Sequence, residues 1–467
     1  MKKGVLSCDL GASSGRVMFI SIEKEELIVE EMYRYKNEPI QTEKGLFWNF
    51  EEMFSEIKTG IKKTIEKGYE VLSLGIDTWG VDYGWIDKEG NLVQNPYCYR
   101  DSRVEAVIEE VHKIVDDKEL YKITGNSFYK FNTIYQLYAD LKYDEKIKKE
   151  GCKVLFTPNL IGYYLTGKMV NEYSIASTSG LIDQSKRVFS EELLEKLKIS
   201  RDFFSNLVEA GTVLGNIKNE IATEFNCKAF PIINVNCHDS ASAVNYCNNF
   251  KEGNLFLING TWSLIGCLNN LPIKNDEAYK YKISNEGQEK FKSRVIRLIP
   301  GTWILQRLKL DFEKMNKNYS YGDFGNLAKS SRETLFIDLE EEELVFPNSM
   351  LEAMKKLLPR KEYKDEDIIK IAYNSILKKY KESIEVLERI TGFQTDKIYA
   401  IGGGIQDNYL INSIKKGIDV ELELGAIEAS TIGNAKTQLF TLGLVKEDFE
   451  WDKLICNYLI KENGVKK

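Results

Sequence analysis

The chain has very few residues with which to bind a soft metal. Only two histidines, His112 and His238, occur among 467 residues, and none of the eight cysteines belongs to a CxxC pair. Structural zinc sites and cysteine redox centres draw on such clusters. The sequence therefore indicates buried free thiols rather than a metal site built from cysteine and histidine.

Long apolar runs and blocks of basic residues are also missing. No uninterrupted apolar segment approaches the length that spans a bilayer, and residues 1–4 lead directly into a polar-flanked strand rather than a signal peptide. The net charge of −7 disfavours a partner bound through its phosphate backbone. We therefore expect a cytoplasmic protein, monomeric or homodimeric, that binds neither a membrane nor a nucleic acid.

Two common signatures of phosphoryl transfer are absent as well. The chain contains neither a GxxxxGK[ST] sequence nor an HRD and DFG set, which excludes the P-loop and protein-kinase designs. Its hydrophobic content of 43% and charged content of 29% are ordinary for a globular enzyme. A chain of 467 residues is too long for one core.

Residues 5–20 predict a β-hairpin with an unusual tip. Two apolar runs flank a turn of small residues, whose glycines permit backbone conformations closed to other residues, so backbone N–H groups could converge on an anion. Asp9 precedes the turn, and a carboxylate near phosphates needs a bridging cation, so we interpret it as a magnesium ligand. An ordinary hairpin with an acidic shoulder is the alternative. The tip consists of Gly11, Ala12, Ser13, Ser14 and Gly15, followed by Arg16.

The next elements predict an α/β unit. Residues 26–35 form a third strand, and Asn49 caps an amphipathic helix that Gly68 ends. Residues 71–77 then form a buried strand, and ligands of open α/β sheets collect at the carboxyl ends of such strands. The segment found there is Thr78, Trp79, Gly80, Val81 and Asp82.

A histidine stands beside an acid at the start of a later helix. Residues 232–237 predict a strand that delivers His238 and Asp239 to a run of small residues. Such a pair is more often a capped helix start than a catalytic pair. Residues 171–180, rich in small hydroxyl side chains, could pack closely against neighbouring backbone, although a polar loop is the default interpretation.

The second half of the chain opens as the first does. Residues 254–267 again predict strand, small-residue turn and strand, and Thr261 in that turn could offer its hydroxyl and N–H to phosphates. Such an internal repeat indicates a duplicated domain with a cleft between the copies. We expect one domain over residues 1–243 and the other over residues 244–467.

A glycine turn follows late in the second half. Residues 365–389 predict a long helix that Gly392 ends, and residues 397–401 predict a strand. Three glycines then permit a flat ligand to lie against the main chain, although they could simply let helix and sheet pack closely. These are Gly402, Gly403 and Gly404.

Together these features predict a nucleotide held between two domains. In this interpretation the two hairpins hold the phosphates of ATP, Mg²⁺ bridges them to Asp9, and the glycine turn packs on adenine. Closing the domains over a bound acceptor would exclude water, which otherwise competes for the phosphoryl group.

The quoted residues resemble the FGGY family of carbohydrate kinases, which share a duplicated ribonuclease-H-like, actin-like ATPase fold. The resemblance runs in order from the first strand to about residue 434, and no one segment carries it alone. It rests on residues 9–16, 76–82, 237–243, 259–263 and 402–408.

The resemblance implies ATP-dependent phosphorylation of the first-carbon hydroxyl of L-rhamnulose. It assigns the general base to Asp239, whose carboxylate would accept the hydroxyl proton and contribute roughly 10²–10⁴ in rate. Contacts to ATP are implied for residues 12–16, Thr261, Gln306 and Gly403. Contacts to the ketose are implied for Gly80, His238 and Asp239, with Thr78, Trp79 and Asp82 in the same segment.

One residue departs from the pattern of the family members that act on L-rhamnulose. They have a sugar-contacting asparagine eight residues before the glutamine that corresponds to Gln306, and here Leu298 stands there. Losing a hydrogen-bond partner to a buried hydroxyl costs about 1–3 kcal/mol. The alternatives are therefore a kinase for another ketose or polyol, such as L-fuculose or xylulose, and a non-enzymatic actin-like nucleotide switch, which has no need of a sugar-facing base.

Overall fold

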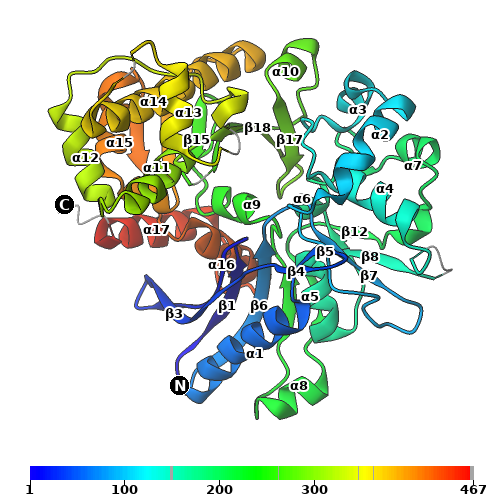
Figure 1. Cartoon of the computed structure of the whole chain (residues 1–467). Helices are drawn as coiled ribbons and strands as arrows, with labels where there is room; N and C mark the ends of the chain where they lie inside the picture. The colour runs from blue at the N-terminus through cyan, green and yellow to red at the C-terminus, as the bar shows by residue number, and fades with distance from the viewer. Residues whose placement is uncertain (148–150, 261, 345–346, 361, 463–467) are drawn as a thin grey trace.

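The protein is described here from a computed structural model, which describes residues 1–147, 151–260, 262–344, 347–360 and 362–462 (Figure 1). Its first half is built on a six-stranded sheet. The predicted opening hairpin is confirmed, since β1 and β2 pair antiparallel, while β1 runs parallel to β6. The strand order is β13 (Thr212–Asn216), β14 (Pro231–Asn234), β6 (Glu70–Thr78), β1 (Lys3–Leu10), β2 (Ser14–Glu23) and β3 (Glu26–Lys36).

The second half repeats this topology. In each sheet three antiparallel strands are followed by two parallel ones, so the order β3-β2-β1-β6-β14 matches the order β18-β16-β15-β19-β20. The predicted duplication is therefore confirmed. The second sheet runs β17 (Ile283–Gly287), β18 (Ser293–Pro300), β16 (Trp262–Asn269), β15 (Asn254–Ile258), β19 (Lys397–Ile401) and β20 (Glu421–Leu424).

Helices flank both sheets. The predicted cap of α1 (Phe50–Glu66) is confirmed, since the Asn49 side chain accepts a hydrogen bond from the Glu52 N–H at 3.3 Å. The predicted long helix, α14 (Asp365–Thr391), ends at Gly392 with a φ of 80°, a left-handed conformation that favours glycine. The other helices are α2 (Ile108–Ile114), α3 (Asp117–Thr124), α4 (Thr133–Tyr143), α5 (Thr157–Thr166), α6 (Tyr173–Ala176), α7 (Glu191–Lys196), α8 (Asn219–Glu224), α9 (Asp239–Val244), α10 (Asp276–Lys280), α11 (Trp303–Lys314), α12 (Tyr321–Ser330), α13 (Met350–Leu357), α15 (Asn408–Gly417), α16 (Ala429–Thr441) and α17 (Asp448–Glu462).

Short elements complete the fold. Pairs of short strands support loops around the first sheet, and single 3₁₀ turns join several helices. The short strands are β4 (Ile40–Thr42), β5 (Gly45–Phe47), β7 (Tyr83–Ile86), β8 (Lys153–Phe156), β9 (Asn171–Glu172), β10 (Ile182–Asp183), β11 (Val188–Phe189) and β12 (Leu207–Val208). The turns are η1 (Ser102–Ala106), η2 (Arg201–Phe203), η3 (Glu342–Leu344) and η4 (Gly403–Gln406).

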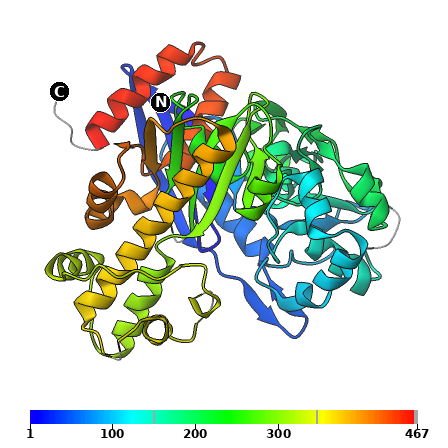
Figure 2. The same cartoon turned by 90° about the horizontal axis from the view of Figure 1, so that it is seen from above.

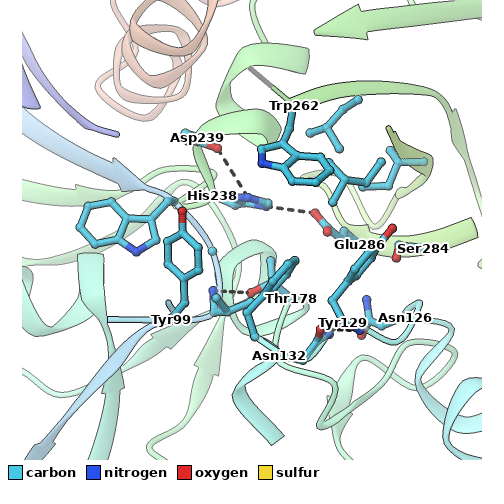
Figure 3. A pocket seen from close by; sticks show the side chains of 17 residues that line it. Tyr99, Asn126, Tyr129, Asn132, Thr178, His238, Asp239, Trp262, Ser284 and Glu286 are labelled. Atoms are coloured by element: carbon cyan, nitrogen blue, oxygen red, sulfur yellow. Dashed lines mark hydrogen bonds and ion pairs between the residues drawn. The ribbon is translucent and has the colours of Figure 1, made fainter. Parts of the chain in front are cut away.

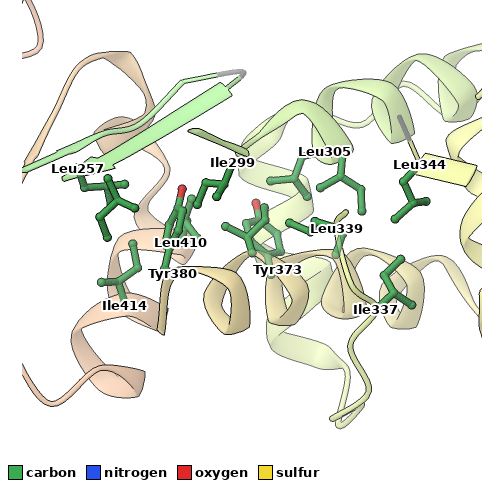
Figure 4. Packing of buried hydrophobic residues seen from close by; sticks show 14 of the residues in the cluster. Leu257, Ile299, Leu305, Ile337, Leu339, Leu344, Tyr373, Tyr380, Leu410 and Ile414 are labelled. Carbon is green, nitrogen blue, oxygen red and sulfur yellow. The ribbon is translucent and has the colours of Figure 1, made fainter. Parts of the chain in front are cut away.

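The core of the second half forms between its sheet and α14. Figure 4 shows Tyr373 and Tyr380 of this helix directed at side chains from β15, β18, α11 and α15, including Leu257, Ile299 and Leu410. These side chains are almost completely buried. Because burial of apolar area is the main stabilising term in folding, this core fixes the second sheet and therefore the strands that reach the cleft.

The two halves are in close contact through α9 and α16. A Cβ atom on Gly433 of α16 would lie 1.8 Å from the Ser242 carbonyl oxygen of α9, so the backbones touch. Helix α16 also packs on β1 and β6, and α17 lies beside β3 (Figures 1 and 2). The second half of the sequence thus supplies helices to the first sheet, and α9 itself crosses residue 243. The division at residues 243 and 244 stays a prediction.

The close packing considered for residues 171–180 is confirmed, and their default interpretation as a polar loop is wrong. They are buried throughout and include α6, whose N-terminus is capped by the Glu172 carboxylate. The same carboxylate accepts a bond from the Cys237 N–H at 3.1 Å. The hydroxyl-rich segment is therefore a support for the chain that leads into residue 238.

Most of the cysteines are buried, as the composition indicated. Six of the eight lie in the interior, whereas Cys456 is exposed. In the part of the chain that the structure describes, no helix has both the length and the apolar character needed to cross a bilayer.

Candidate active site

A pocket of about 260 Å³ opens between the two halves of the chain (Figure 3). The carboxyl end of β6, the loops before α4 and the start of α9 form one side, and strands β16 to β18 of the second sheet form the other. The lining residues are Trp79, Gly80, Val81, Tyr99, Asn126, Tyr129, Phe131, Asn132, Thr178, His238, Asp239, Trp262, Leu264, Ser284, Glu286, Ile296 and Leu298.

His238 and Asp239 lie side by side in this pocket. The pair that the sequence places at the start of a helix therefore reaches a cavity. Asp239 is the first residue of α9, and its Oδ1 lies 3.5 Å from His238 Nε2, with 35% of its side chain exposed. Burial against the cleft wall raises the pKa of Asp239 to about 6, and the positive charges of His238 and Arg294 only partly oppose this shift. Asp239 is therefore a stronger base than an ordinary aspartate.

A buried arginine fastens the histidine and its neighbours to the second sheet. Arg294 of β18 is fully buried, and its Nη1 donates to Ser240 Oγ at 2.7 Å while its Nη2 donates to Glu286 Oε2 at 2.7 Å. His238 Nδ1 lies 3.1 Å from Arg294 Nη2 and 3.0 Å from Glu286 Oε2. One guanidinium thus holds the start of α9 against the β17–β18 hairpin.

No sequence motif marks Arg294 or Glu286. Both lie in a charged stretch with no turn or glycine pattern to mark it. The one available signal was the position of Arg294 directly before the apolar residues Val295 and Ile296, because a charge inside a strand that packs on both faces needs a buried partner.

Two residues expected at the sugar, Thr78 and Asp82, do not line the pocket in the described part of the chain. Asp82 is fully buried, and its Oδ2 accepts bonds from Trp48 Nε1 at 2.6 Å and from Trp79 Nε1 at 2.9 Å. Burial raises the pKa of Asp82 to about 6, opposed by these bonds. Because its oxygens are occupied, Asp82 orients Trp79 rather than reaching a ligand. Thr78 is likewise buried, with its hydroxyl bonded to the Trp79 carbonyl at 2.8 Å.

The other residues predicted to contact the sugar do line the cavity. Trp79 and Gly80 line it. Behind them the Val81 N–H donates a hydrogen bond to the Thr178 hydroxyl, with 3.0 Å between nitrogen and oxygen. A Cβ atom on Gly80 would lie 3.1 Å from Thr178, so glycine lets this turn pack closely on α6 and its following loop.

The first hairpin tip has a different geometry from the one expected. Neither Gly11 nor Gly15 adopts a positive φ. Gly15 is required instead by packing, because a Cβ atom there would lie 2.3 Å from the ring of Tyr35. The tip is a tight turn in which the Gly11 N–H donates to the Ser14 carbonyl at 2.9 Å and Asn37 Nδ2 donates to the Gly11 carbonyl at 3.0 Å.

Asp9 lies at the base of this tip in a cluster of charged groups. Its Oδ2 accepts a bond from Arg16 Nη2 at 2.7 Å and another from the Ser430 hydroxyl, and Arg16 also pairs with Glu428. Both bonds fall on Oδ2, so Oδ1 is the oxygen left for a cation among the described residues. Carboxylate oxygen is the ligand type that Mg²⁺ prefers, so the donor set fits the ion.

A second carboxyl group, Asp77, stands next to Asp9. The two residues are register partners in β1 and β6, and Asp77 is fully buried with its Oδ2 accepting a bond from Asn434 Nδ2 at 2.5 Å. Burial, together with the charges of Asp9 and Asp239, raises the pKa of Asp77 well above its usual value.

A cavity of about 530 Å³ lies beside the glycine turn of the second half. A Cβ atom on Gly404 would lie 2.5 Å from the Asn259 carbonyl oxygen, whereas one on Gly403 would meet no atom within 4 Å. Gly403 therefore exposes its backbone to an open space that a flat ring could fill. The residues that line this cavity are Asn259, Gly260, Thr302, Leu305, Gln306, Tyr321, Gly403, Gly404, Gln406 and Asp407.

The other residues predicted to bind the nucleotide lie in different places. Gln306 lines this cavity, and its Nε2 donates to Thr302 Oγ1 at 3.2 Å. Gly402 has a φ of 84° and precedes η4, so it shapes the turn. Thr261 lies outside the described residues.

The chain is similar to carbohydrate kinases in sequence. The family model described as the FGGY family of carbohydrate kinases, N-terminal domain, matches residues 4–245. Curated relatives at 29–33% identity are named rhamnulokinase. One of them, from Ligilactobacillus salivarius, is 33% identical over 461 residues, which cover 97% of this chain and 94% of the relative.

Solved structures are similar in fold. A xylulose kinase from Lactobacillus acidophilus superposes with a TM-score of 0.84 at 14% identity, covering 97% of this chain and 92% of the other. A Plasmodium falciparum glycerol kinase with ADP gives a TM-score of 0.81 at 15% identity, with 97% and 92% covered. These likenesses confirm the predicted fold class, two duplicated α/β domains of the actin-like ATPase type.

The Arg294 cluster predicts a non-additive effect on stability. Replacing Arg294 by Met removes the guanidinium partner of the buried Glu286 carboxylate and leaves it only His238, which should reduce the free energy of unfolding by about 3–5 kcal/mol. Adding Glu286→Gln to that variant should raise the thermal unfolding midpoint again, because the uncompensated charge is removed. Effects that simply add in the double variant would contradict this account of the cluster.

Proposed function

Because the chain belongs to the FGGY family of carbohydrate kinases and is a sugar kinase, we propose that it transfers the γ-phosphoryl group of ATP to the first-carbon hydroxyl of L-rhamnulose. The observation that carries the proposal is the position of Asp239, a carboxylate of raised pKa in the pocket between the two halves. The choice of L-rhamnulose as the sugar rests on the relatives that are named rhamnulokinase. Membership of a carbohydrate kinase family excludes a nucleotide switch that has no substrate.

Asp239 acts as the general base. A sugar hydroxyl is a poor nucleophile at neutral pH, and a carboxylate that accepts its proton as the phosphorus–oxygen bond forms raises its reactivity. His238 lies 3.5 Å from Asp239 and is fixed by Arg294 and Glu286 at the wall of the pocket, where it orients the ketose. Trp79 and Tyr99, both held by Asp82, form the side of the pocket that faces His238.

The nucleotide is held mainly by the second half. The open backbone at Gly403 and the side chain of Gln306 border the cavity in which adenine would lie. The tips of the two hairpins, with residues 12–16 and Thr261, then hold the phosphates. Magnesium bound at Asp9 would neutralise phosphate charge. Arg16, now paired with Asp9 and Glu428, is positioned to exchange one of these partners for a phosphate oxygen.

A panel of sugars tests the substrate. With ATP and Mg²⁺, ADP release should be faster with L-rhamnulose than with L-fuculose or D-xylulose, by tenfold or more in kcat/KM, since sugar kinases distinguish hydroxyl configuration through buried hydrogen bonds. Turnover of L-fuculose or D-xylulose at the higher rate would replace the proposed sugar by that one.

Asp239→Asn should reduce kcat about 10²–10⁴-fold, because the amide cannot accept the proton. The dissociation constant for ATP, measured by titration calorimetry, should change less than threefold, since Asp239 lies on the sugar side of the cleft. Asp419→Asn, which changes an exposed carboxylate, is the matched control and should keep full activity. Undiminished turnover by the Asp239 variant would rule out the base.

The pH profile should report the same group. Only the ionised carboxylate accepts a proton, and the pKa of Asp239 is about 6, so kcat/KM for the ketose should be level above that pH and fall about tenfold for each unit below it. The initial rate measured between pH 5 and pH 8 with saturating ATP checks this. A profile that stays level down to pH 5 would contradict the assignment.

A further inference from the structure

A third cavity, of about 560 Å³, lies between helices α12, α14 and α15 of the second half. The three helices lie together at the left of Figure 1. None of the residues that line this cavity lines the pocket of Asp239 or the cavity beside Gly403. Its volume falls within the range of about 300–1,000 Å³ that is usual for small-molecule sites. The cavity is therefore large enough for a ligand, and the proposed reaction does not use it.

Each of the three helices contributes a lysine to this space, which we call the lysine cavity. The lysines are Lys329 of α12, Lys370 of α14 and Lys416 of α15, and no aspartate or glutamate lines the cavity with them. In the part of the chain that the structure describes, none of the three forms an ion pair with a carboxylate. Lys378 of the same α14, by contrast, pairs with Glu382 at 3.4 Å. Three positive charges without counterions around one space attract an anion, even in a chain whose net charge is −7.

Lys370 keeps most of its hydrogen-bonding capacity for a ligand. Its side chain is half-buried, and its Nζ donates to the Tyr409 hydroxyl at 2.5 Å. An ammonium group has three N–H donors, so two of them remain for an acceptor in the cavity. Lys329 and Lys416 are exposed and can turn their ammonium groups to the same acceptor. Bonds of this kind to phosphate oxygens are charge-assisted and therefore strong.

The rest of the lining is neutral and mixed in character. Leu377 and the ring of Tyr409 are apolar, whereas Asn412 and Ser413 carry an amide and a hydroxyl. The Ser413 hydroxyl donates to the Tyr409 carbonyl at 2.7 Å, which leaves its oxygen free to accept a hydrogen bond. A bare phosphate ion would fill only a small part of this volume. The neutral groups therefore favour an anion that carries an organic body with hydroxyl groups.

The lysine cavity is separated from the proposed nucleotide cavity by a thin wall. Tyr373 lines the lysine cavity, and its hydroxyl donates to Asp407 Oδ2 at 2.8 Å. Asp407 lines the cavity beside Gly403 and caps α15 by accepting bonds from the N–H groups of Tyr409 and Leu410, both at 3.0 Å. Because Tyr373 and Asp407 are bonded to each other, they close the passage between the two spaces. A ligand in the lysine cavity is thus not an extension of bound ATP.

We propose that the lysine cavity is a second anion site, which binds a small phosphate ester with a polar body, such as a sugar phosphate. Lys329, Lys370 and Lys416 hold the phosphate group, and Asn412 and Ser413 hydrogen-bond the body. The site does not depend on which sugar the protein phosphorylates.

Titration calorimetry with fructose 1-phosphate tests the site. The protein is first saturated with Mg²⁺ and a non-hydrolysable ATP analogue, so that the phosphate positions of the active site are filled. Fructose 1-phosphate should still bind, with a dissociation constant below about 1 mM. Inorganic phosphate should bind at least tenfold more weakly, because it lacks the body that contacts the neutral lining. Lys370→Met should weaken the binding of fructose 1-phosphate at least tenfold, because it removes a partly buried charge-assisted bond.

Two neighbouring lysines of α15 provide a matched pair of variants. Lys416 and Lys415 are both exposed, but only Lys416 lines the cavity. Lys416→Met should weaken the binding of fructose 1-phosphate at least fivefold, whereas Lys415→Met, which changes the net charge equally, should weaken it less than twofold. Because both side chains are exposed, neither variant should unfold the protein.

Three outcomes would overturn the inference. They are the absence of binding to the unmodified protein, equal weakening by Lys415→Met and Lys416→Met, and binding of inorganic phosphate as tight as that of the ester. ADP release with the panel of sugars, measured without fructose 1-phosphate, tests the proposed function separately. Each of the two proposals can therefore fail while the other stands.

Discussion

Three carboxyl groups meet where β1 and β6 end, and much of the site depends on how their charge is accommodated. Asp9 and Asp77 are neighbours across the two strands, and the charge of Asp9 also raises the pKa of Asp239. Burial and the repulsion between these groups raise the pKa of Asp77 well above its usual value, and Arg16 pairs with Asp9. The same crowding that requires a counterion makes the location suitable for a metal-bound triphosphate.

The two halves contribute different chemistry to the cleft. The first half supplies the carboxylates Asp9, Asp77 and Asp239, while the second supplies the glycine-lined cavity and the apolar side chains Leu264, Ile296 and Leu298 of the pocket. Arg294 joins the two halves, because it reaches from β18 to Ser240 and His238 beside the proposed base. The direct contact of Gly433 with Ser242 holds the other end of α9. Asp239 is therefore supported from both halves before any ligand binds.

Local patterns in the sequence predicted the parts of this structure that depend on local physics. Alternating apolar residues, the cap at Asn49 and the stop at Gly392 each act within a few residues, and the hairpins, α1 and α14 are confirmed. The repeat of the strand order could also be predicted, since each half opens with the same pattern.

The interpretations that were wrong concern contacts between distant segments. Asp82 was placed at the sugar because it follows a strand, yet Trp48 and Gln136, from other parts of the chain, occupy its oxygens. Gly15 was given a conformational role, but the ring of Tyr35 is what excludes a side chain there. Arg294 has no local pattern, because its importance comes from partners at positions 238, 240 and 286.

In the proposed role of Asp239, its environment resolves a conflict that any general base meets at neutral pH. A base must be ionised to accept a proton, yet a carboxylate with an ordinary pKa near 4 accepts protons weakly. With a pKa of about 6 the group attracts a proton roughly a hundredfold more strongly than an exposed aspartate, and roughly nine in ten molecules still carry the carboxylate at pH 7. Burial supplies this gain in basicity, and the nearby charges of His238 and Arg294 keep the shift from going so far that the carboxyl would stay protonated. Arg294 thus contributes to both the position of the base and its ionisation.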